Sequence, residues 1–330
     1  MMKKKCAAIT GVGAYVPPRI LTNKDLEKMV DTSDEWITTR TGIKERRIAD
    51  EETATSDMAV KAAEEALQKA NLEVEEIDLI VVATITPDML FPSTACIVQD
   101  KLGARKAACF DLSAGCTGFI YGISVAAQFI ENGTYQNALV IGAETLSKIV
   151  NWEDRNTCVL FGDGAGAVVL KEVAGDAGIL STYLGSDGSG SVLLKQPAGG
   201  SRMPASLDTV EQKLHSIHMN GNDVFKFAVK VMGEASLTAL EKCGMGKEDI
   251  DFLVPHQANS RIIQSAIKRL KLPEEKVVVN LNKYGNMSSA SIPVALYEAL
   301  QDNKISSGDI IVMVGFGAGL TWGASVVKWL

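Results

Sequence analysis

Short apolar segments alternate along the chain with segments whose apolar residues recur every three to four positions. The apolar segments lack polar alternation and lie at 79–84, 107–110, 138–142, 252–254, 276–281 and 310–315. Strands of this kind are typical of a parallel or mixed sheet that is covered by helices on both faces. Helical periodicity is found between them, at 59–71, 119–131, 234–244 and 260–271. The pattern predicts an α/β fold.

The two halves of the chain carry similar elements in the same order. The apolar strand at 77–82 corresponds to the one at 250–254, and Val140–Gly142 corresponds to Met313–Gly315, at a nearly constant offset of about 170 residues. Each half closes with a glycine-rich segment and a last apolar strand. We therefore predict two pseudo-symmetric halves with mixed sheets, residues 1–174 and 175–330, joined at the polar segment 171–178.

The two glycine-rich segments have different expected roles. Neither fits the phosphate-binding patterns GxxxxGK[ST] or GxGxxG. For Gly162–Gly166 we expect tight turns in which only glycine tolerates a positive φ. For Gly315–Gly319 a second possibility stands beside that one, because bare backbone also allows amides to be directed at a substrate oxygen.

Composition sets the class of protein more than its chemistry. The 330 residues are 46% hydrophobic and 22% charged, which fits about two domain-sized units with a large core. The net charge of −7 offers no bulk attraction to nucleic acid or to an anionic membrane surface. Six cysteines form no CxxC pair, and no apolar stretch is long enough to span a membrane. We expect a cytoplasmic protein.

The start of the chain allows two interpretations. Lys3–Lys5 followed by the apolar residues 6–9 could mimic a signal peptide. Gly11, Gly13 and the pair Pro17–Pro18 interrupt the apolar run too early for that. A first β-strand that ends in a turn is the expectation.

Cys116 is the cysteine best placed for chemistry. It follows the apolar run 107–110 and precedes the helix predicted from Phe119, so it lies at or near a helix N-terminus. Unpaired amides and the helix dipole favour the thiolate there, and the thiol pKa should fall below its free value of about 8.5. The other five cysteines have no such context, and inert packing is the expectation for them.

His256 and Asn286 are the matching candidates in the second half. His256 follows the strand at 252–254 through Pro255, and a strand's carboxyl end in an α/β fold is where ligands usually bind. Asn286 lies where the internal offset places the counterpart of Cys116; taken alone, an asparagine there would more often stabilise a turn. His215 and His218 lie in a polar stretch, and no HxH or HxxxH spacing predicts a metal site.

These residues and several motifs resemble the thiolase superfamily and, within it, the β-ketoacyl-acyl-carrier-protein synthase III family. The resemblance spans essentially the whole chain. Its motifs, in order, are Asp34–Ile37 with Arg40–Ile43, the Cys116 loop, Met219–Gly221, His256–Asn259, Tyr284–Asn286, and Gly315–Gly319 before Thr321–Gly323. It implies a thiolase-like five-layer αβαβα fold, a homodimer, and catalysis by Cys116, His256 and Asn286.

The implied reaction is a decarboxylative Claisen condensation. An acyl group moves from a short acyl-CoA to Cys116, and malonyl-acyl carrier protein then gives β-ketoacyl-acyl carrier protein, which initiates type II fatty acid synthesis. The backbone N–H groups of Cys116 and Ala318 would form the oxyanion hole. Ala318 stands where many relatives carry glycine, and it should serve if its φ is negative. No cofactor is implied, because acyl-CoA is a substrate.

The resemblance also assigns binding residues. Trp36 and Arg155 would flank the adenine of CoA, and Asn259 would lie near the pantetheine arm. Arg40 shares a helix face with Trp36. The amphipathic helix from Ser260 carries a basic face, which is usually only solvated but suits an acidic carrier protein. The residues expected to contact the carrier protein are Gln257, Ala258, Asn259, Ser260, Arg261, Lys268 and Arg269.

The acyl pocket is the least defined part of the prediction. Ile85, Leu146 and Phe316 are expected to shape it, and Phe91 resembles a residue that reaches the pocket of the partner subunit. The sequence does not indicate whether the primer is acetyl, propionyl or branched.

Three alternatives remain at this point. A type III polyketide synthase-like relative shares the Cys-His-Asn set but uses malonyl-CoA. A non-catalytic CoA-binding or scaffold protein could keep the fold, although retention of all three residues argues against it. A papain-like cysteine hydrolase fits the strand–Cys–helix context and leaves the duplication unexplained.

Overall fold

The first of two main sheets is built from the first half of the chain. The structure, a computed structural model, describes residues 5–330. The strand order is β1-β7-β6-β4-β5, where β4 is parallel to β5 and β6, and β7 is antiparallel to β1 and β6. The strands are β1 (Lys5–Tyr15), β4 (Leu79–Ala83), β5 (Ala108–Leu112), β6 (Asn137–Glu144) and β7 (Gly164–Ala174).

The second sheet repeats this arrangement with the second half of the chain. Its order is β11-β12-β13-β8, with β11 parallel to β12 and the other neighbours antiparallel. The strands are β8 (Gly178–Ser186), β11 (Phe252–Pro255), β12 (Ile310–Gly317) and β13 (Thr321–Lys328). Each of them takes the place and direction of β1, β4, β6 and β7 respectively, so the predicted pseudo-symmetry of the fold is confirmed.

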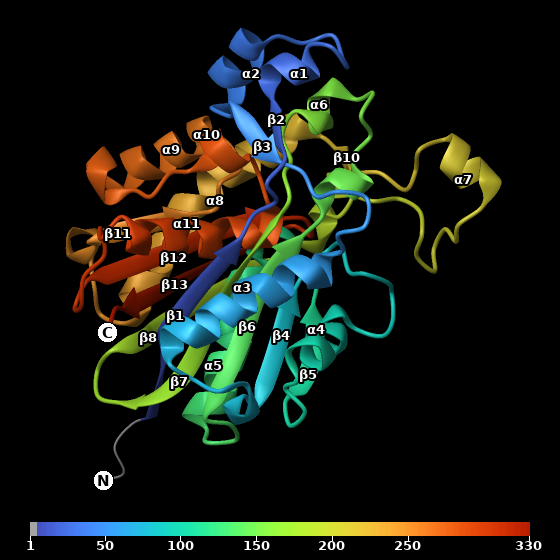
Figure 1. Cartoon of the computed structure of the whole chain (residues 1–330). Helices are drawn as coiled ribbons and strands as arrows, with labels where there is room; N and C mark the ends of the chain where they lie inside the picture. Colours follow the sequence, from blue (N-terminus) through green and yellow to red (C-terminus); the bar gives the residue numbers. More distant parts are fainter. Residues whose placement is uncertain (1–4) are drawn as a thin grey trace.

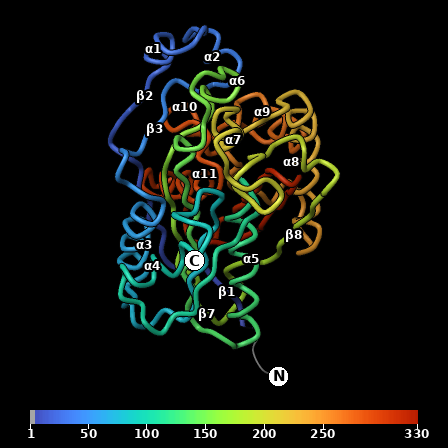
Figure 2. The backbone as a smooth tube through the Cα atoms, turned by 90° about the vertical axis from the view of Figure 1, so that its right-hand side faces the viewer, coloured from blue at the N-terminus to red at the C-terminus, as the bar shows by residue number. Residues whose placement is uncertain are grey.

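Helices and sheets form five layers (Figures 1 and 2). The outer helices α3 (Thr55–Ala70) and α4 (Thr94–Leu102) pack on the first sheet, and α8 (Gly221–Lys242) packs on the second, with α9 (Ser260–Leu270) against it. Between the sheets lie α5 (Gly118–Glu131) and α11 (Ser291–Gln301), which contact strands of both. Figure 2 shows α3 and α4 at the left edge and α8 at the right.

Shorter elements lie around this body. Two small sheets pair β2 (Ile20–Thr22) with β3 (Glu45–Arg47) and β9 (Leu194–Lys195) with β10 (His218–Met219). The short helices are α1 (Asn23–Leu26), α2 (Asp34–Thr41), α6 (Arg155–Cys158), α7 (Leu207–Glu211) and α10 (Leu281–Tyr284). The 3₁₀ turns are Val74–Glu76, Gly115–Thr117, Leu146–Ile149, Gly188–Gly190, Lys247–Asp249, Glu274–Lys276 and Ser288–Ala290. In Figure 1, α7 projects from the body.

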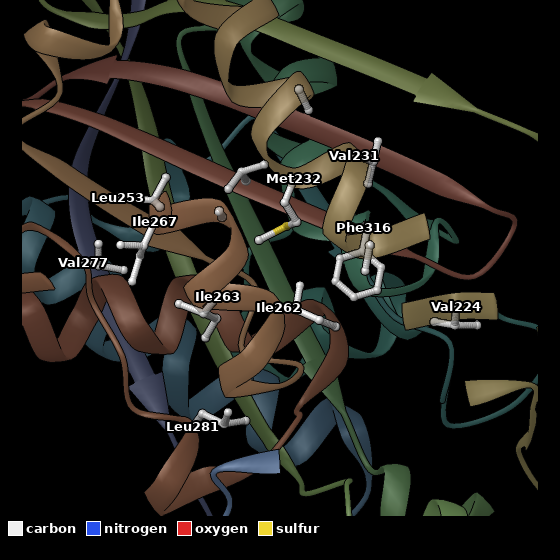
Figure 3. Packing of buried hydrophobic residues seen from close by; sticks show 14 of the residues in the cluster. Val224, Val231, Met232, Leu253, Ile262, Ile263, Ile267, Val277, Leu281 and Phe316 are labelled. Atoms are coloured by element: carbon white, nitrogen blue, oxygen red, sulfur yellow. The ribbon is translucent and has the colours of Figure 1, made fainter. Parts of the chain in front are cut away.

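Burial of the central strands follows the sequence pattern. All residues of β4, β6 and β12 are buried, as expected for strands with helices on both faces. The helix predicted at 260–271 buries its apolar stripe, and Ile262, Ile263 and Ile267 point into the core beside α8 (Figure 3). No helix in the described part of the chain is long and apolar enough to cross a membrane.

The prediction of a strand at 276–281 is wrong. Only Val277 forms a bridge, to Leu253, and Val278 donates its N–H to the Leu253 carbonyl. Beyond it, the amides of Asn280 and Leu281 donate to Oε1 of Gln257, at 3.1 and 3.2 Å. Because a side chain takes these donors, the backbone leaves the sheet at the position where β5 runs in the first half.

The turns predicted at Gly162–Gly166 are also wrong. None of these glycines has a positive φ, and Gly164 and Gly166 belong to β7. A Cβ on Gly162 would lie 2.4 Å from the Tyr284 carbonyl oxygen, and one on Gly166 would lie 2.7 Å from the Pro293 side chain. Glycine is required there by close approach of the second half.

The first strand forms as expected, although it continues through both of its glycines. A Cβ on Gly11 or Gly13 would lie 2.2 Å from a carbonyl oxygen of α3, so the glycines allow this helix to pack directly on β1. Lys3 and Lys4 of the basic start lie outside the described residues.

β7 extends to Ala174 and β8 begins at Gly178, so β7 covers half of the polar segment 171–178. The domain boundary at 174 stays a prediction.

Candidate active site

Cys116, His256 and Asn286 line one cavity of about 90 Å³. Cys116 lies in the 3₁₀ turn between β5 and α5, His256 directly follows β11, and Asn286 lies two residues before the turn at Ser288. Cys116 and His256 thus follow the strands β5 and β11, whereas Asn286 follows the short helix α10. The fold brings together the three residues that the sequence nominates.

The backbones around Cys116 and Ala318 touch, and glycine makes this possible. A Cβ on Gly317 would lie 2.5 Å from Cys116 N, and one on Gly115 would lie 2.8 Å from Ala318 N. Gly115 also has a φ of +55°, which favours glycine. The N–H groups of Cys116 and Ala318 therefore belong to one packed unit beside the sulfur. Ala318 does not have a positive φ, as its expected role requires.

The Cys116 thiol is neutral at rest, contrary to the sequence expectation. The residue is 7% exposed, and burial raises the pKa of its thiol to about 12. Cys116 itself lies in the short 3₁₀ turn Gly115–Thr117, and the helix α5, whose dipole would favour the thiolate, begins only at Gly118. Desolvation outweighs the helix dipole, and the predicted low thiol pKa is wrong.

His256 is a buried neutral imidazole. The residue is 1% exposed, and burial lowers the pKa of its ring to about 3. Its backbone N–H donates to the Val314 carbonyl at 2.8 Å, and its ring packs edge-on to Phe316 at 5.6 Å. Neither ring nitrogen has a hydrogen-bond partner among residues 5–330. A neutral ring has one nitrogen that accepts a proton and one that donates a hydrogen bond.

The amide of Asn286 is oriented by its own turn. Its Oδ1 accepts the Ser288 N–H at 2.8 Å, and its backbone bridges to the segment before β7 through Leu160 and Gly162. With Oδ1 occupied in this way, the NH₂ group is the end left for a ligand. The site thus presents a thiol, an imidazole and an amide donor.

A second cavity, of about 150 Å³, also touches Cys116. Ile85 and Leu146 line it, at the positions expected for acyl-pocket residues. Phe316 does not: it lines the cavity of His256 and Asn286 and packs beside Val224 of α8 and Ile262 of α9 (Figure 3). Phe91 is 84% exposed and lines neither cavity of its own chain.

Sequence reasoning missed several residues of this second cavity. They are Ile149, Phe161, Leu194, Lys195, Gln196, Ile217 and Ser288. They lie in the two-residue strand β9, in 3₁₀ turns and in loops, which are too short to show a periodic pattern that would mark them. Phe161 and Leu194 line both cavities, and Cys116 stands between the two.

The predicted CoA residues form a cluster on the surface. The Arg40 and Arg155 guanidinium carbons lie 5.1 and 5.3 Å from the centre of the Trp36 ring. Arg155 also donates to the Asp31 carbonyl at 2.7 Å. Asn259 donates to the Arg40 carbonyl at 3.0 Å and caps α9, which connects this cluster to the cavity that Asn259 lines.

The predicted carrier-protein residues divide into exposed and buried ones. Gln257 is fully buried, and its amide bonds to Pro255, Val278, Asn280 and Leu281. A carrier-protein contact at Gln257 is therefore wrong, because that side chain supports the loop after β11. Ala258 lines the His256 cavity, whereas Ser260, Arg261 and Lys268 border an open groove next to it.

The basic face of α9 is only partly free. Arg261 lies 5.2 Å above the Phe225 ring, and Arg269 pairs with Glu234 at 3.2 Å. Phe225 borders both the groove and the His256 cavity.

Within residues 5–330 no cluster of three or more His, Cys, Asp or Glu is arranged to hold a metal ion.

Comparison with known proteins places the chain in one family. The family descriptions "3-Oxoacyl-[acyl-carrier-protein (ACP)] synthase III C terminal" and "3-Oxoacyl-[acyl-carrier-protein (ACP)] synthase III" match residues 240–329 and 110–188. β-Ketoacyl-[acyl-carrier-protein] synthase III of Caldanaerobacter subterraneus subsp. tengcongensis is 64% identical over 329 residues, covering 100% of this chain and 99% of the relative. Its counterpart from Clostridioides difficile is 63% identical over 323 residues, covering 98% of each chain.

A solved structure agrees with these sequence relatives. The crystal structure of 3-oxoacyl-[acyl-carrier-protein] synthase III from Aquifex aeolicus VF5 superposes with a TM-score of 0.90 at 51% identity, covering 98% of this chain and 100% of that one. This confirms both the thiolase-like fold and the resemblance drawn from the motifs. The chain belongs to the 3-oxoacyl-[acyl-carrier-protein] synthase III family.

Proposed function

We propose that this chain condenses a short acyl-CoA with malonyl-acyl carrier protein through an acyl-Cys116 intermediate. The observation that carries this proposal is the position of Cys116 between two cavities, one lined mostly by apolar residues, the other by His256 and Asn286. A two-step transfer needs one space for the bound acyl group and another through which donors arrive and leave.

In the first half-reaction Cys116 attacks the thioester carbon of the acyl-CoA. The Cys116 sulfur forms a bond to that carbon, the carbon–sulfur bond to CoA breaks, and the thiol proton ends on the CoA thiol. Because burial raises the pKa of the Cys116 thiol and lowers the pKa of the His256 ring, passing the thiol proton to the departing CoA sulfur avoids a charged imidazole. The N–H groups of Cys116 and Ala318 would stabilise the oxyanion, at about 3 kcal/mol for each donor.

In the second half-reaction malonyl-acyl carrier protein loses CO₂. The bond to the carboxylate carbon breaks, and its electron pair forms an enolate whose oxygen accepts hydrogen bonds from His256 and the Asn286 NH₂. The enolate carbon then bonds to the acyl carbon, the bond to Cys116 breaks, and the Cys116 thiolate takes up one proton from solvent. Two neutral donors suit this step, because a nearby carboxylate would oppose the developing negative charge.

The acyl group is proposed to occupy the cavity of about 150 Å³. A cavity of about that size holds a molecule such as benzene, so it suits primers of a few carbon atoms. Cys116 and the Ile85 and Leu146 side chains border this space. A panel of acyl-CoA primers of increasing length would define the limit.

CoA and the carrier protein are proposed to approach along α9. The Trp36 ring with Arg155 offers a flat surface and a cation for the adenine, and Asn259 stands between that cluster and the His256 cavity. Arg261 and Lys268 border the groove outside the cavity and suit an acidic carrier protein. Both substrates would then send their pantetheine arms past Phe225.

A homodimer is proposed from the loop that precedes α4. Met89, Leu90 and Phe91 are 49%, 81% and 84% exposed, which is unusual for three consecutive large apolar residues. Cover by a second subunit would remove them from water and would bring Phe91 toward that subunit's acyl cavity. Sedimentation of the wild type and of Phe91→Asp would test this.

The function is tested by separating the two half-reactions. Radiolabelled acetyl-CoA should label Cys116, as located by peptide mapping, and the labelled protein should release acetoacetyl product only with malonyl-acyl carrier protein. Product formation from malonyl-CoA would instead favour a type III polyketide synthase-like activity. Absence of any label on the folded protein would indicate a non-catalytic member of the fold.

A further inference from the structure

Glu144 is a buried carboxyl that the proposed reaction does not use. It is the last residue of β6, and its side chain is fully shielded from solvent. None of the ion pairs within residues 5–330 includes it. An ionised carboxylate at such a place would be costly, so the hydrogen bonds around it are informative.

One oxygen of Glu144 is a pure acceptor. Its Oε2 lies 3.2 Å from Thr84 Oγ1, 3.1 Å from Ile85 N and 2.7 Å from Thr86 Oγ1. The Thr84 hydroxyl accepts the Thr86 N–H, and the Thr86 hydroxyl accepts the Thr145 N–H. Both hydroxyl protons are therefore free to point at Oε2, as expected for the carbonyl oxygen of a carboxylic acid.

The other oxygen faces a hydroxyl whose proton is already used. Ser289 Oγ lies 2.8 Å from the Ala83 carbonyl oxygen and 2.9 Å from Glu144 Oε1. A carbonyl oxygen carries no proton, so the contact with Ala83 is a hydrogen bond only if Ser289 donates its single hydroxyl proton there. The contact between Ser289 Oγ and Oε1 is then a hydrogen bond only if Oε1 supplies the proton.

Asp163 is a buried carboxyl with the opposite pattern. It accepts hydrogen bonds from Ser147 N, Ser147 Oγ and Ala49 N, and each of these donors brings its own proton. Burial raises the pKa of both carboxyls, so burial alone does not distinguish them. The arrangement of donors does: each contact of Asp163 has a donor with its own proton, whereas Glu144 Oε1 and the Ala83 carbonyl face the same Ser289 hydroxyl.

The Glu144 network lies directly behind the candidate nucleophile. Ile85, whose N–H is bound by Glu144, lines the acyl cavity together with Ser288 and Cys116. The Ser288 hydroxyl has no hydrogen-bond partner among residues 5–330, although the residue lines the same cavity as Cys116. A charge on Glu144 would disfavour the Cys116 thiolate.

We propose that Glu144 is a positioning residue that keeps a proton on Oε1 and, as a neutral acid, joins the Ile85 loop to the Ser288–Ser289 turn beside Cys116. The proton makes the tie between the two halves of the chain continuous, from the Glu144 acid to the Ser289 hydroxyl and on to the Ala83 carbonyl. It also removes a negative charge from the surroundings of the sulfur. The inference rests on the proposed function only for the role of Cys116.

Glutamine is the conservative replacement that this assignment predicts will succeed. In Glu144→Gln the NH₂ group can replace Oε1–H as donor to Ser289, and the amide oxygen can accept from Thr84, Ile85 and Thr86. Acetylation of Cys116 by acetyl-CoA should stay within about threefold of wild type, whereas Glu144→Ala should lose at least about tenfold, because neither loop is then held in place. A Glu144→Gln rate as low as that of Glu144→Ala would overturn the proposal.

Two readouts report the proton itself. Infrared spectroscopy of the resting protein should show the C=O stretching band of a protonated buried carboxyl, and this band should vanish in Glu144→Gln and persist in Asp163→Asn. The pH dependence of Cys116 alkylation by iodoacetamide should be the same in wild type and Glu144→Gln. A band that vanishes only in Asp163→Asn, or alkylation of Glu144→Gln that is about threefold faster or more near pH 7, would show an ionised Glu144.

These measurements separate the inference from the proposed function. The infrared band is recorded without substrate, so a chain that fails to take up acetyl groups would refute the proposed reaction and leave the proton assignment open to the same test. A chain that is acetylated normally but lacks the band would refute the proton assignment alone.

Discussion

Gly317→Ala is the substitution whose effect is best defined by the structure. The new Cβ would lie 2.5 Å from Cys116 N and 3.2 and 3.3 Å from its Cα and Cβ, all of them backbone atoms or atoms fixed to the backbone. Ordinary contact begins at 3.4 Å, so Gly317 and Cys116 must separate by about 0.9 Å. That movement displaces the Ala318 N–H relative to the sulfur.

A displacement of about 1 Å in a catalytic arrangement costs about 100-fold in rate, and loss of one oxyanion donor costs a similar amount, about 3 kcal/mol. We therefore expect Gly317→Ala to form acetyl-Cys116 at least about 100-fold more slowly than wild type. The assay is a single-turnover reaction with acetyl-CoA followed by intact-protein mass spectrometry. Thermal unfolding monitored by circular dichroism establishes that the variant is folded.

Gly315→Ala is the matched control, two residues earlier in the same strand. Its Cβ would meet Ile292 Cδ1 at 3.4 Å, His256 Cβ at 3.5 Å and Ile120 Cδ1 at 3.6 Å, which are ordinary contacts. Its acetylation rate should change by less than about threefold, because no catalytic group is displaced. A folded Gly317→Ala protein that is acetylated as fast as Gly315→Ala would refute the reasoning.

Three further predictions concern the individual groups. Cys116→Ser should abolish acetylation, whereas Asn286→Ala should keep it within about tenfold and lose malonyl decarboxylation by at least about 100-fold, measured as CO₂ release; equal loss of both steps in Asn286→Ala would contradict this division. Burial lowers the pKa of His256 from 6.5 to about 3 in the folded protein. The neutral ring therefore contributes fully to the free energy of unfolding above about pH 6.5, and this contribution is lost as the pH falls toward 3. Between about pH 7 and about pH 5 the unfolding free energy should fall by about 2 kcal/mol more in wild type than in His256→Asn, measured by urea denaturation, and parallel curves would count against a buried neutral ring. Lys268→Glu should lower kcat/KM for malonyl-acyl carrier protein severalfold at low salt without affecting acetylation, whereas Lys69→Glu, on the opposite outer layer, should change neither.

The main elements of the fold could be predicted because their sequence signal is local. β4, β6 and β12 are continuous apolar runs, and the internal offset by itself aligns Cys116 with Asn286. The segment 276–281 shows the limit of that signal. Its apolar residues suit a strand, but the oxygen that takes its amides belongs to Gln257, which no local pattern connects to it.

The chemistry of the site is only partly accessible from the sequence, because burial decides it. Position at a helix start predicts an acidic thiol at Cys116, and the opposite direction follows from desolvation. Glu144 cannot be recognised from the sequence for the same reason. Its partners are Thr84, Ile85, Thr86 and Ser289, from other parts of the chain, and only the folded arrangement brings them to its carboxyl group.

The pairing of two similar sheets has a consequence for how activity can be gained or lost. Cys116 comes from the first half of the chain, and His256 and Asn286 come from the second, so the proposed catalytic set needs both halves. A fragment that contains only one half of this chain is therefore expected to have no activity. Turnover of the whole chain reports that the two halves are packed together correctly.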